Sequence, residues 1–237
     1  MILALSTSTP QFGAALMTIQ GTVLAEVAFG VGRGNFSGLM PAVDYMVDCC
    51  GTPIEEIEAV VVARGPGSFT GLRVGLSAAK GMARGLEIPL IGVSSLAALA
   101  FRIPFSDRPV CAVLDSRKGE LFYGVYNRPL YRPMTPRQEE DCIRESDLPK
   151  VMEEPAVFIG NDYLRQETLI RELLGDRAIC APPALWHPAA SAVGGLGLER
   201  FLRGETDDLR DLVPVYFRPP DIRPRPAQRV DDKMEGP

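Results

Sequence analysis

The chain has 237 residues, of which 46% are hydrophobic and 23% are charged, proportions that are ordinary for a globular protein with a core and a solvated surface. This length suits one large domain or two small lobes. A net charge near −5 argues against a broad, uniformly basic nucleic-acid surface, although it leaves room for a local basic patch.

The first hundred residues predict a complete lobe with the order βββαβα. Its first two strands flank a Ser/Thr/Pro turn, which predicts a hairpin. Apolar residues at helical spacing predict an amphipathic helix before Gly51, and three consecutive valines predict a buried parallel strand after it. The expected elements are strands Ile2–Leu5, Phe12–Ile19 and Thr22–Ala28, helix Phe36–Cys50, strand Ile57–Ala63, helix Thr70–Arg84, strand Pro89–Val93 and a helix from Ser94 through Arg102.

The second half of the chain predicts a repeat of this plan after a hinge at Pro104–Pro109. Strand Val110–Asp115 and its return Glu120–Tyr126 repeat the pattern of Leu3–Thr7, an apolar strand that ends in a small polar residue, which we interpret as an internal duplication. The further expected elements are a loop at Arg128–Arg137, a helix near Glu145–Met152, strand Ala156–Gly160, helix Tyr163–Leu174, strand Arg177–Cys180 and helix Pro188–Leu202.

The sequence therefore predicts an α/β fold with two tandem lobes, residues 1–105 and 106–218, and a Pro/Arg-rich tail, residues 219–237. The last helix, at about 188–203, is a candidate to pack back on the first lobe.

Redox and targeting features indicate a cytoplasmic protein. The five cysteines form an odd set without CxxC spacing, so we expect reduced thiols and neither a disulfide framework nor a zinc site. Residues Met1–Ser6 lack the basic region of a signal peptide, and no apolar run reaches the about 18 residues of a membrane span. A single histidine, His187, excludes a histidine-based metalloprotease, and we expect a structural or surface role for it.

The run Gly65–Gly75, GPGSFTGLRVG, lies between a predicted strand and helix, where phosphate-binding loops usually occur. It is no P-loop, because no lysine follows a suitably placed glycine. It is no nucleophile elbow, because Pro66 and Thr70 occupy the glycine positions around Ser68. The next strand ends in Val93–Ser95, without the acidic residue that holds a dinucleotide ribose. All three enzyme interpretations therefore fail on chemistry.

The helix after this loop has one unusually thin face, and glycine inside a helix costs about 0.5–1 kcal/mol relative to alanine. Close approach of another element is the usual compensation. Two interpretations stay open, tight packing within the lobe and a helix–helix interface with another subunit. The small residues of this face are Gly71, Gly75, Ala78, Ala79 and Gly81.

The glycine-loop run resembles the signature of the TsaB (YeaZ) family, the inactive paralogues of TsaD, which was once labelled a glycoprotease of the peptidase M22 type. The resemblance covers nearly the whole chain and implies two actin-like lobes of the ASKHA, ribonuclease-H-like superfamily, each a mixed five-stranded-type sheet flanked by helices. The other stretches that carry it are Ile2–Thr9, Gly92–Leu96, Leu114–Phe122 and Pro214–Arg218.

The resemblance implies a non-catalytic subunit that binds TsaD, together with TsaE, while TsaD transfers a threonylcarbamoyl group to adenosine 37 of ANN-decoding tRNAs. It further implies a homodimer in isolation, contact with tRNA only through the complex, and no cofactor except a nucleotide at the seam between subunits. Self-association and TsaD binding are implied for the first two helices. Mapped onto this sequence, the partner interface is Leu39, Val43, Met46, Val47, Thr70, Gly71, Arg73, Val74, Gly75, Ala78, Ala79 and Met82, and the nucleotide seam is Gly67, Ser68 and Thr70.

Two positions depart from the family pattern, Ser6 in place of an aspartate and Asn35 in place of a histidine. In nucleotide-binding ASKHA proteins that aspartate helps to hold Mg-ATP, and a serine hydroxyl is a poor replacement because Mg²⁺ prefers charged oxygen ligands. Asp115 is the remaining carboxylate in the second lobe. We therefore expect no independent ATP binding by this chain.

Two alternative functions belong to other classes. An ASKHA small-molecule kinase or ATPase needs an acidic pair across the cleft, which Ser6 breaks. A direct RNA-binding module would use the basic tail, whose arginines could contact tRNA phosphates, although a solvated terminus is the simpler interpretation. The arginines of the tail are Arg218, Arg223, Arg225 and Arg229.

Overall fold

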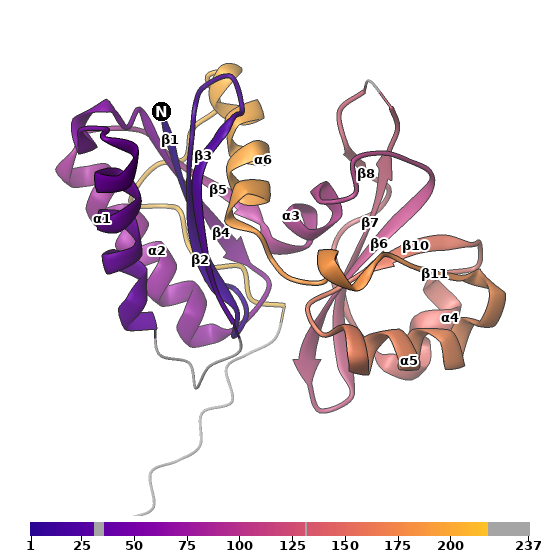
Figure 1. Ribbon diagram of the computed structural model, residues 1–237. Coiled ribbons are helices and arrows are strands. Elements are labelled where there is room, and N and C mark those ends of the chain that lie inside the picture. The colour runs from indigo at the N-terminus through magenta and orange to yellow at the C-terminus, as the bar shows by residue number, and fades with distance from the viewer. Residues whose placement is uncertain (31–35, 131, 218–237) are drawn as a thin grey trace, which may run out of the picture.

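The computed structural model describes residues 1–30, 36–130 and 132–217, which form two lobes, each built on a mixed β-sheet (Figure 1). The first sheet has the order β3-β2-β1-β4-β5, in which β1 is antiparallel to β2 and parallel to β4. Its strands are β1 (Ile2–Ser6), β2 (Phe12–Met17), β3 (Val23–Phe29), β4 (Ala59–Gly65) and β5 (Leu90–Ser94).

Helices cover both faces of the first sheet. α1 (Leu39–Cys50) and α2 (Phe69–Gly85) lie on one face, and α6 (Ala190–Leu202) returns from the far end of the chain to the other face (Figure 1). Alternate residues of each strand point to opposite faces. Accordingly, Leu3 and Leu5 join the core under α1 and α2, whereas Ile2 and Ala4 join the core under α6. All five residues of β1 are buried because both faces are covered.

The second sheet repeats the plan of the first. Its order is β11-β10-β6-β7-β8, with β9 also paired to β7. Like β1, β6 is antiparallel to the strand that follows it in the chain and parallel to a later strand, β10. The strands are β6 (Ser106–Arg117), β7 (Glu120–Arg128), β8 (Thr135–Pro136), β9 (Asp141–Arg144), β10 (Ala156–Ile159) and β11 (Ala178–Cys180). The predicted fold class, two tandem actin-like lobes with helices flanking mixed sheets, is confirmed; among the described residues the first sheet has the five strands expected, and the second has six.

The second core lies between this sheet and the helices packed on it. It includes residues of α3, α5 and β6, among which Val110–Leu114 are at most 1% exposed. α3 also contacts β4 and β5, so it joins the two lobes. The helices are α3 (Ser95–Phe101), α4 (Leu148–Val151) and α5 (Tyr163–Leu174), and the short 3-10 turns are Phe36–Gly38, Ile54–Glu56, Glu145–Asp147, Gly175–Arg177 and Pro183–Leu185.

Local signals in the sequence explain several element ends. Gly51, at φ 59°, ends α1, and its amide bonds back to Asp48. Ser94 begins α3, since its hydroxyl accepts hydrogen bonds from two amides of the first turn. Lys118 and Gly119, both at positive φ, form the two-residue turn between β6 and β7.

Apart from small shifts in strand and helix limits, the main differences from the prediction are the following. β6 begins at Ser106, inside the predicted hinge, although a register shift between Ser106 and Val110 interrupts its pairing with β7. The short strands β8 and β9 were not predicted. The helix expected near Glu145–Met152 is a 3-10 turn followed by one α-helical turn. Residues 203–215 were assigned to the second lobe, but Val215 donates a hydrogen bond to the Arg64 carbonyl of the first.

Two sequence interpretations lie outside the described residues, the replacement at Asn35 and the basic tail with its arginines. Within the described ranges, every helix is too short or too polar to cross a membrane.

Candidate functional site between the lobes and on the first two helices

The thin face of α2 is covered by its own lobe. A Cβ on Gly75 would overlap the Thr7 hydroxyl, and a Cβ on Gly71 would overlap the Thr7 carbonyl. The same Thr7 hydroxyl donates a hydrogen bond of 2.8 Å to the Gly71 carbonyl. The two glycines therefore make room for Thr7, the residue that follows β1, and the expectation that they face a second subunit is corrected. The alternative interpretation, tight packing within the lobe, applies to Gly71 and Gly75.

The other predicted interface residues divide by exposure. Six of the twelve are buried, because their side chains or Cα atoms belong to the interior of the first lobe, so they are unavailable to a partner in this conformation: Leu39, Val43, Met46, Gly71, Gly75 and Ala79. Four are half-buried along the edges of the two helices: Val47, Val74, Ala78 and Met82. Thr70 and Arg73 are exposed. α1 adds two exposed side chains that the sequence had not singled out, Met40 at 40% and Tyr45 at 64%.

The glycine loop is tied to the turn between β1 and β2. The Ser68 amide donates a hydrogen bond of 2.7 Å to the Ser8 carbonyl, and a Cβ on Gly67 would overlap the same carbonyl. Ser68 begins α2, its hydroxyl accepting from the Gly71 amide at 3.3 Å. Two amides that a phosphate would need are thus already bonded within the chain. Of the predicted nucleotide-seam residues, only Thr70 is exposed.

The C-terminal segment packs beside the start of α2. The Arg73 guanidinium lies 3.9 Å from the centroid of the Phe69 ring, and its Nε donates to the Tyr216 hydroxyl at 3.4 Å. The Phe69 and Tyr216 rings are 5.3 Å apart. Phe217 then contacts Phe122 of the second lobe, with ring centroids 6.0 Å apart. The predicted closing motif therefore connects the helical face to both lobes.

The cleft between the lobes does not offer the acidic pair of a nucleotide-binding site. Ser6, at the end of β1, is 1% exposed, and its hydroxyl has no hydrogen-bond partner among the described residues. Asp115, at the corresponding place in β6, has a carboxylate oxygen 3.0 Å from the Arg165 guanidinium. A buried hydroxyl and a carboxylate paired with arginine do not fit Mg-ATP, which needs charged oxygens. This arrangement differs from the acidic pair that the kinase alternative requires.

Two polar contacts that the sequence did not reveal join the lobes. The Gln11 side-chain amide donates to the Asn161 carbonyl at 3.0 Å. Glu140 accepts hydrogen bonds from Ser94 of the first lobe and, at 2.6 Å, from Tyr126 of the second. Burial and the Glu140 carboxylate together raise the pKa of Tyr126 far above its usual range. In the sequence, these contacts are marked only by polar residues near strand ends, a pattern too common to predict a contact.

His187 is half-buried beside a cavity of about 510 Å³ formed by β3, α3 and α6. Its carbonyl accepts a hydrogen bond from Arg102, and burial together with the Arg102 charge lowers the pKa of the imidazole. Opposite it, Glu26 accepts from the Ser191 amide at 2.9 Å and from the Ser191 hydroxyl at 2.8 Å, at the start of α6. These contacts hold α6 against β3, which agrees with a structural role.

Comparison with known proteins identifies the family. The family model described as TsaD, tRNA N6-adenosine threonylcarbamoyltransferase, matches residues 33–221. The chain is similar to the tRNA threonylcarbamoyladenosine biosynthesis protein TsaB of Bacillus subtilis, with 32% identity over 92% of this chain and 93% of the relative. The Escherichia coli TsaB is 30% identical over 92% and 94% of the two chains.

A solved structure agrees with the sequence matches. YeaZ from Pseudomonas aeruginosa superposes with a TM-score of 0.75 and 25% identity, covering 91% of this chain and 98% of that one. The relatives are matched over nearly their whole length, so the likeness involves both lobes. The chain belongs to the TsaB (YeaZ) family and has a role in the biosynthesis of tRNA threonylcarbamoyladenosine.

Proposed function

We propose that this chain is the non-catalytic subunit that binds a TsaD-type threonylcarbamoyltransferase, together with TsaE, and thereby enables transfer of the threonylcarbamoyl group to adenosine 37 of ANN-decoding tRNAs. The observation that carries the proposal is that α1, on a chain whose family belongs to this pathway, exposes two large side chains. Met40 and Tyr45 are 40% and 64% exposed there. Methionine and aromatic side chains are enriched in protein interfaces relative to the rest of the surface.

The interface we propose is the outward part of the predicted one. It comprises the exposed Thr70 and Arg73 with the half-buried Val47, Val74, Ala78 and Met82, and it adds Met40 and Tyr45. Arg73 is already positioned by Phe69 and Tyr216, so less of its side-chain entropy is lost on binding. In isolation, we propose that the same surface pairs with a second copy of the chain.

The cleft supports the non-catalytic part of the proposal. Its one strand-end carboxylate, Asp115, is balanced by Arg165, and Ser6 supplies no charge. We propose no cofactor for the isolated chain. We propose that a nucleotide would bind at the interface between this chain and its partner, beside the exposed Thr70.

Co-expression with the TsaD-type enzyme of the same organism, followed by size-exclusion chromatography, tests this interface. Met40→Asp and Ala78→Arg place a charge on α1 and α2, and both should elute apart from the enzyme. Leu164→Asp is the matched control, because Leu164 is 83% exposed on α5 of the other lobe. Wild type and control should co-elute with the enzyme.

Circular dichroism must first show that each variant is folded, and Met40→Asp, at an exposed position, keeps the test valid should Ala78→Arg unfold. Undiminished co-elution of both folded variants would mean that the interface lies elsewhere. Failure of the wild-type chain to co-elute would refute the partnership itself.

A further inference from the structure

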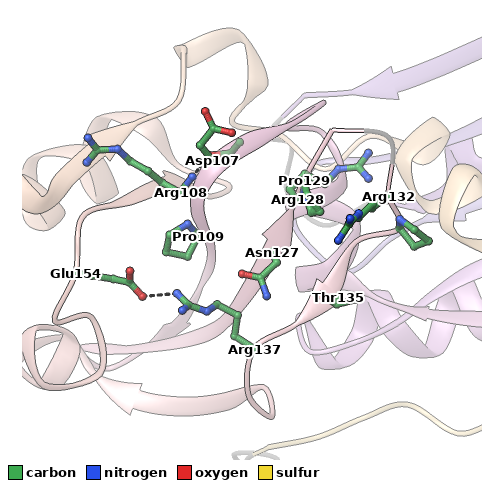
Figure 2. A pocket seen from close by; sticks show the side chains of 12 residues that line it. Asp107, Arg108, Pro109, Asn127, Arg128, Pro129, Arg132, Thr135, Arg137 and Glu154 are labelled. Atoms are coloured by element: carbon green, nitrogen blue, oxygen red, sulfur yellow. Dashed lines mark hydrogen bonds and ion pairs between the residues drawn. The ribbon is translucent and has the colours of Figure 1, made fainter.

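A second surface, at the opposite end of the molecule from α1 and α2, gathers arginine side chains around an open cavity of about 710 Å³ (Figures 1 and 2). Arg108 comes from the start of β6, Arg128 from the end of β7, Arg132 from the following loop and Arg137 from just after β8. Asp107 and Glu154 are the acidic residues of the lining. Four cations against two carboxylates make this a basic site on an acidic chain.

The sequence concentrates positive charge at this place. Residues 127–137, NRPLYRPMTPR, contain three arginines and no acidic residue, whereas the whole chain has a net charge of −5. Three prolines in the same stretch restrict the backbone on which the arginines stand. A negative net charge argues against a uniformly basic surface but is compatible with a local basic patch of this kind.

The four guanidinium groups differ in how they are held. Arg137 forms an ion pair with Glu154, drawn as a dashed line in Figure 2. Arg128 is fixed by a hydrogen bond of 2.9 Å from its Nε to the Ile103 carbonyl and lies 4.4 Å over the Phe101 ring. Arg108 and Arg132 are exposed and form no ion pair with any residue in the described ranges. These two are therefore available to an external anion.

We propose that this arginine cavity binds the phosphodiester backbone of an RNA, an inference that rests on the proposed function because tRNA is the RNA which that function supplies. Arginine forks match phosphate oxygens and stay charged at all physiological pH values. Several arginines spread around an open cavity suit a chain of phosphates better than one small anion. The surface lies on the second lobe, so an enzyme bound to α1 and α2 would leave it uncovered (Figure 1).

The test measures binding of fluorescein-labelled tRNA to the full chain by fluorescence anisotropy at NaCl concentrations from about 0.05 to about 0.5 M. In this range, release of counterions from the RNA makes the affinity depend on salt. Each lost phosphate contact lowers the slope of log K against log salt by about 0.9, so Arg108→Gln/Arg132→Gln should lose about 1.8 units. If the two lines meet near 1 M salt, the double variant binds about 60-fold more weakly at 0.1 M.

The controls separate charge from fold and from location. Arg108→Lys/Arg132→Lys keeps both charges and should retain the slope. Arg210→Gln removes an exposed arginine outside the cavity and should bind like wild type. An unchanged slope and affinity in the Gln double variant would overturn the proposal. Undetectable tRNA binding by the wild-type chain at about 0.05 M NaCl, the lowest salt concentration of the titration, would also overturn it.

A competition arm distinguishes the sources of phosphate. Inorganic phosphate or ATP at about 1 mM, roughly a typical cellular ligand level, should leave the tRNA bound. Displacement of tRNA by either would show a small-anion site and refute the RNA assignment. Because this assay contains no transferase, loss of the TsaD interaction and loss of RNA binding are separate results.

Discussion

The packing of Thr7 into the glycine face of α2 can be tested by adding one methyl group. In Gly75→Ala the new Cβ would overlap the Thr7 hydroxyl and lie 3.2 Å from Thr7 Cβ and Cγ2. Overfilling a packed interior costs about 1–3 kcal/mol. Displacing the hydroxyl also costs its hydrogen bond to Gly71, about 0.5–1.5 kcal/mol. Alanine returns about 0.5–1 kcal/mol of helix propensity, so the expected net destabilisation is about 1–3 kcal/mol.

The matched control lies on the same helix. Gly81 has nothing within 4 Å of an added Cβ, so Gly81→Ala should stabilise the protein by about 0.5–1 kcal/mol. Urea unfolding at constant m-value measures both changes. Thr7→Ala removes the hydroxyl and methyl groups that the new Cβ would meet. The loss of unfolding free energy in Thr7→Ala/Gly75→Ala should therefore be about 1 kcal/mol smaller than the sum of the losses in the two single variants. If Gly75→Ala stabilised the protein as much as Gly81→Ala, the packing of Thr7 against Gly75 would be refuted. The thin face of α2 would then again be a candidate partner interface.

Three further contacts give measurable expectations. Tyr126→Phe removes the hydrogen bond to the Glu140 carboxylate and should cost about 1.5–3 kcal/mol in urea unfolding; a change below about 0.5 kcal/mol would show that this hydrogen bond contributes little to stability. Glu26→Ala removes both acceptors for Ser191 at the start of α6 and should cost about 1 kcal/mol, with thermal melts as the check. His187 has a lowered pKa in the fold, so the unfolded chain binds its proton first as pH falls. The wild type should therefore lose stability relative to His187→Gln below about pH 6.5, and a pH-independent difference would contradict this.

Much of the fold could be predicted because its signals are local. The helix expected at Tyr163–Leu174 has those limits in the structure, and α2 extends the expected Thr70–Arg84 by one residue at each end. Capping residues and helical spacing act within one or two turns, so a single sequence carries them. β8 and β9 could not be predicted, since strands of two and four residues are too short to show an alternating pattern, and both pair with β7.

The candidate site was only partly predictable, for a different reason. The thin face of α2 was visible in the sequence, but the identity of its neighbour was not, because Thr7 lies 64 residues from Gly71. Burial of Leu39 and Met46 follows from the way α1 lies on the sheet, which periodicity alone does not distinguish from an interface. The arginine cavity is formed at the open end of the β6–β7 hairpin together with later residues such as Arg137 and Glu154, so the sequence alone did not reveal it.

The central claim is that this chain enables a transferase and performs no bond-making itself. The most direct measurement is incorporation of a labelled threonylcarbamoyl group into tRNA by purified TsaD-type enzyme and TsaE, with and without this chain. The account predicts product when all are present, a large loss when the chain is omitted or carries Met40→Asp, and none from the chain alone. Product formation by the isolated chain, or full activity without it, would contradict the account.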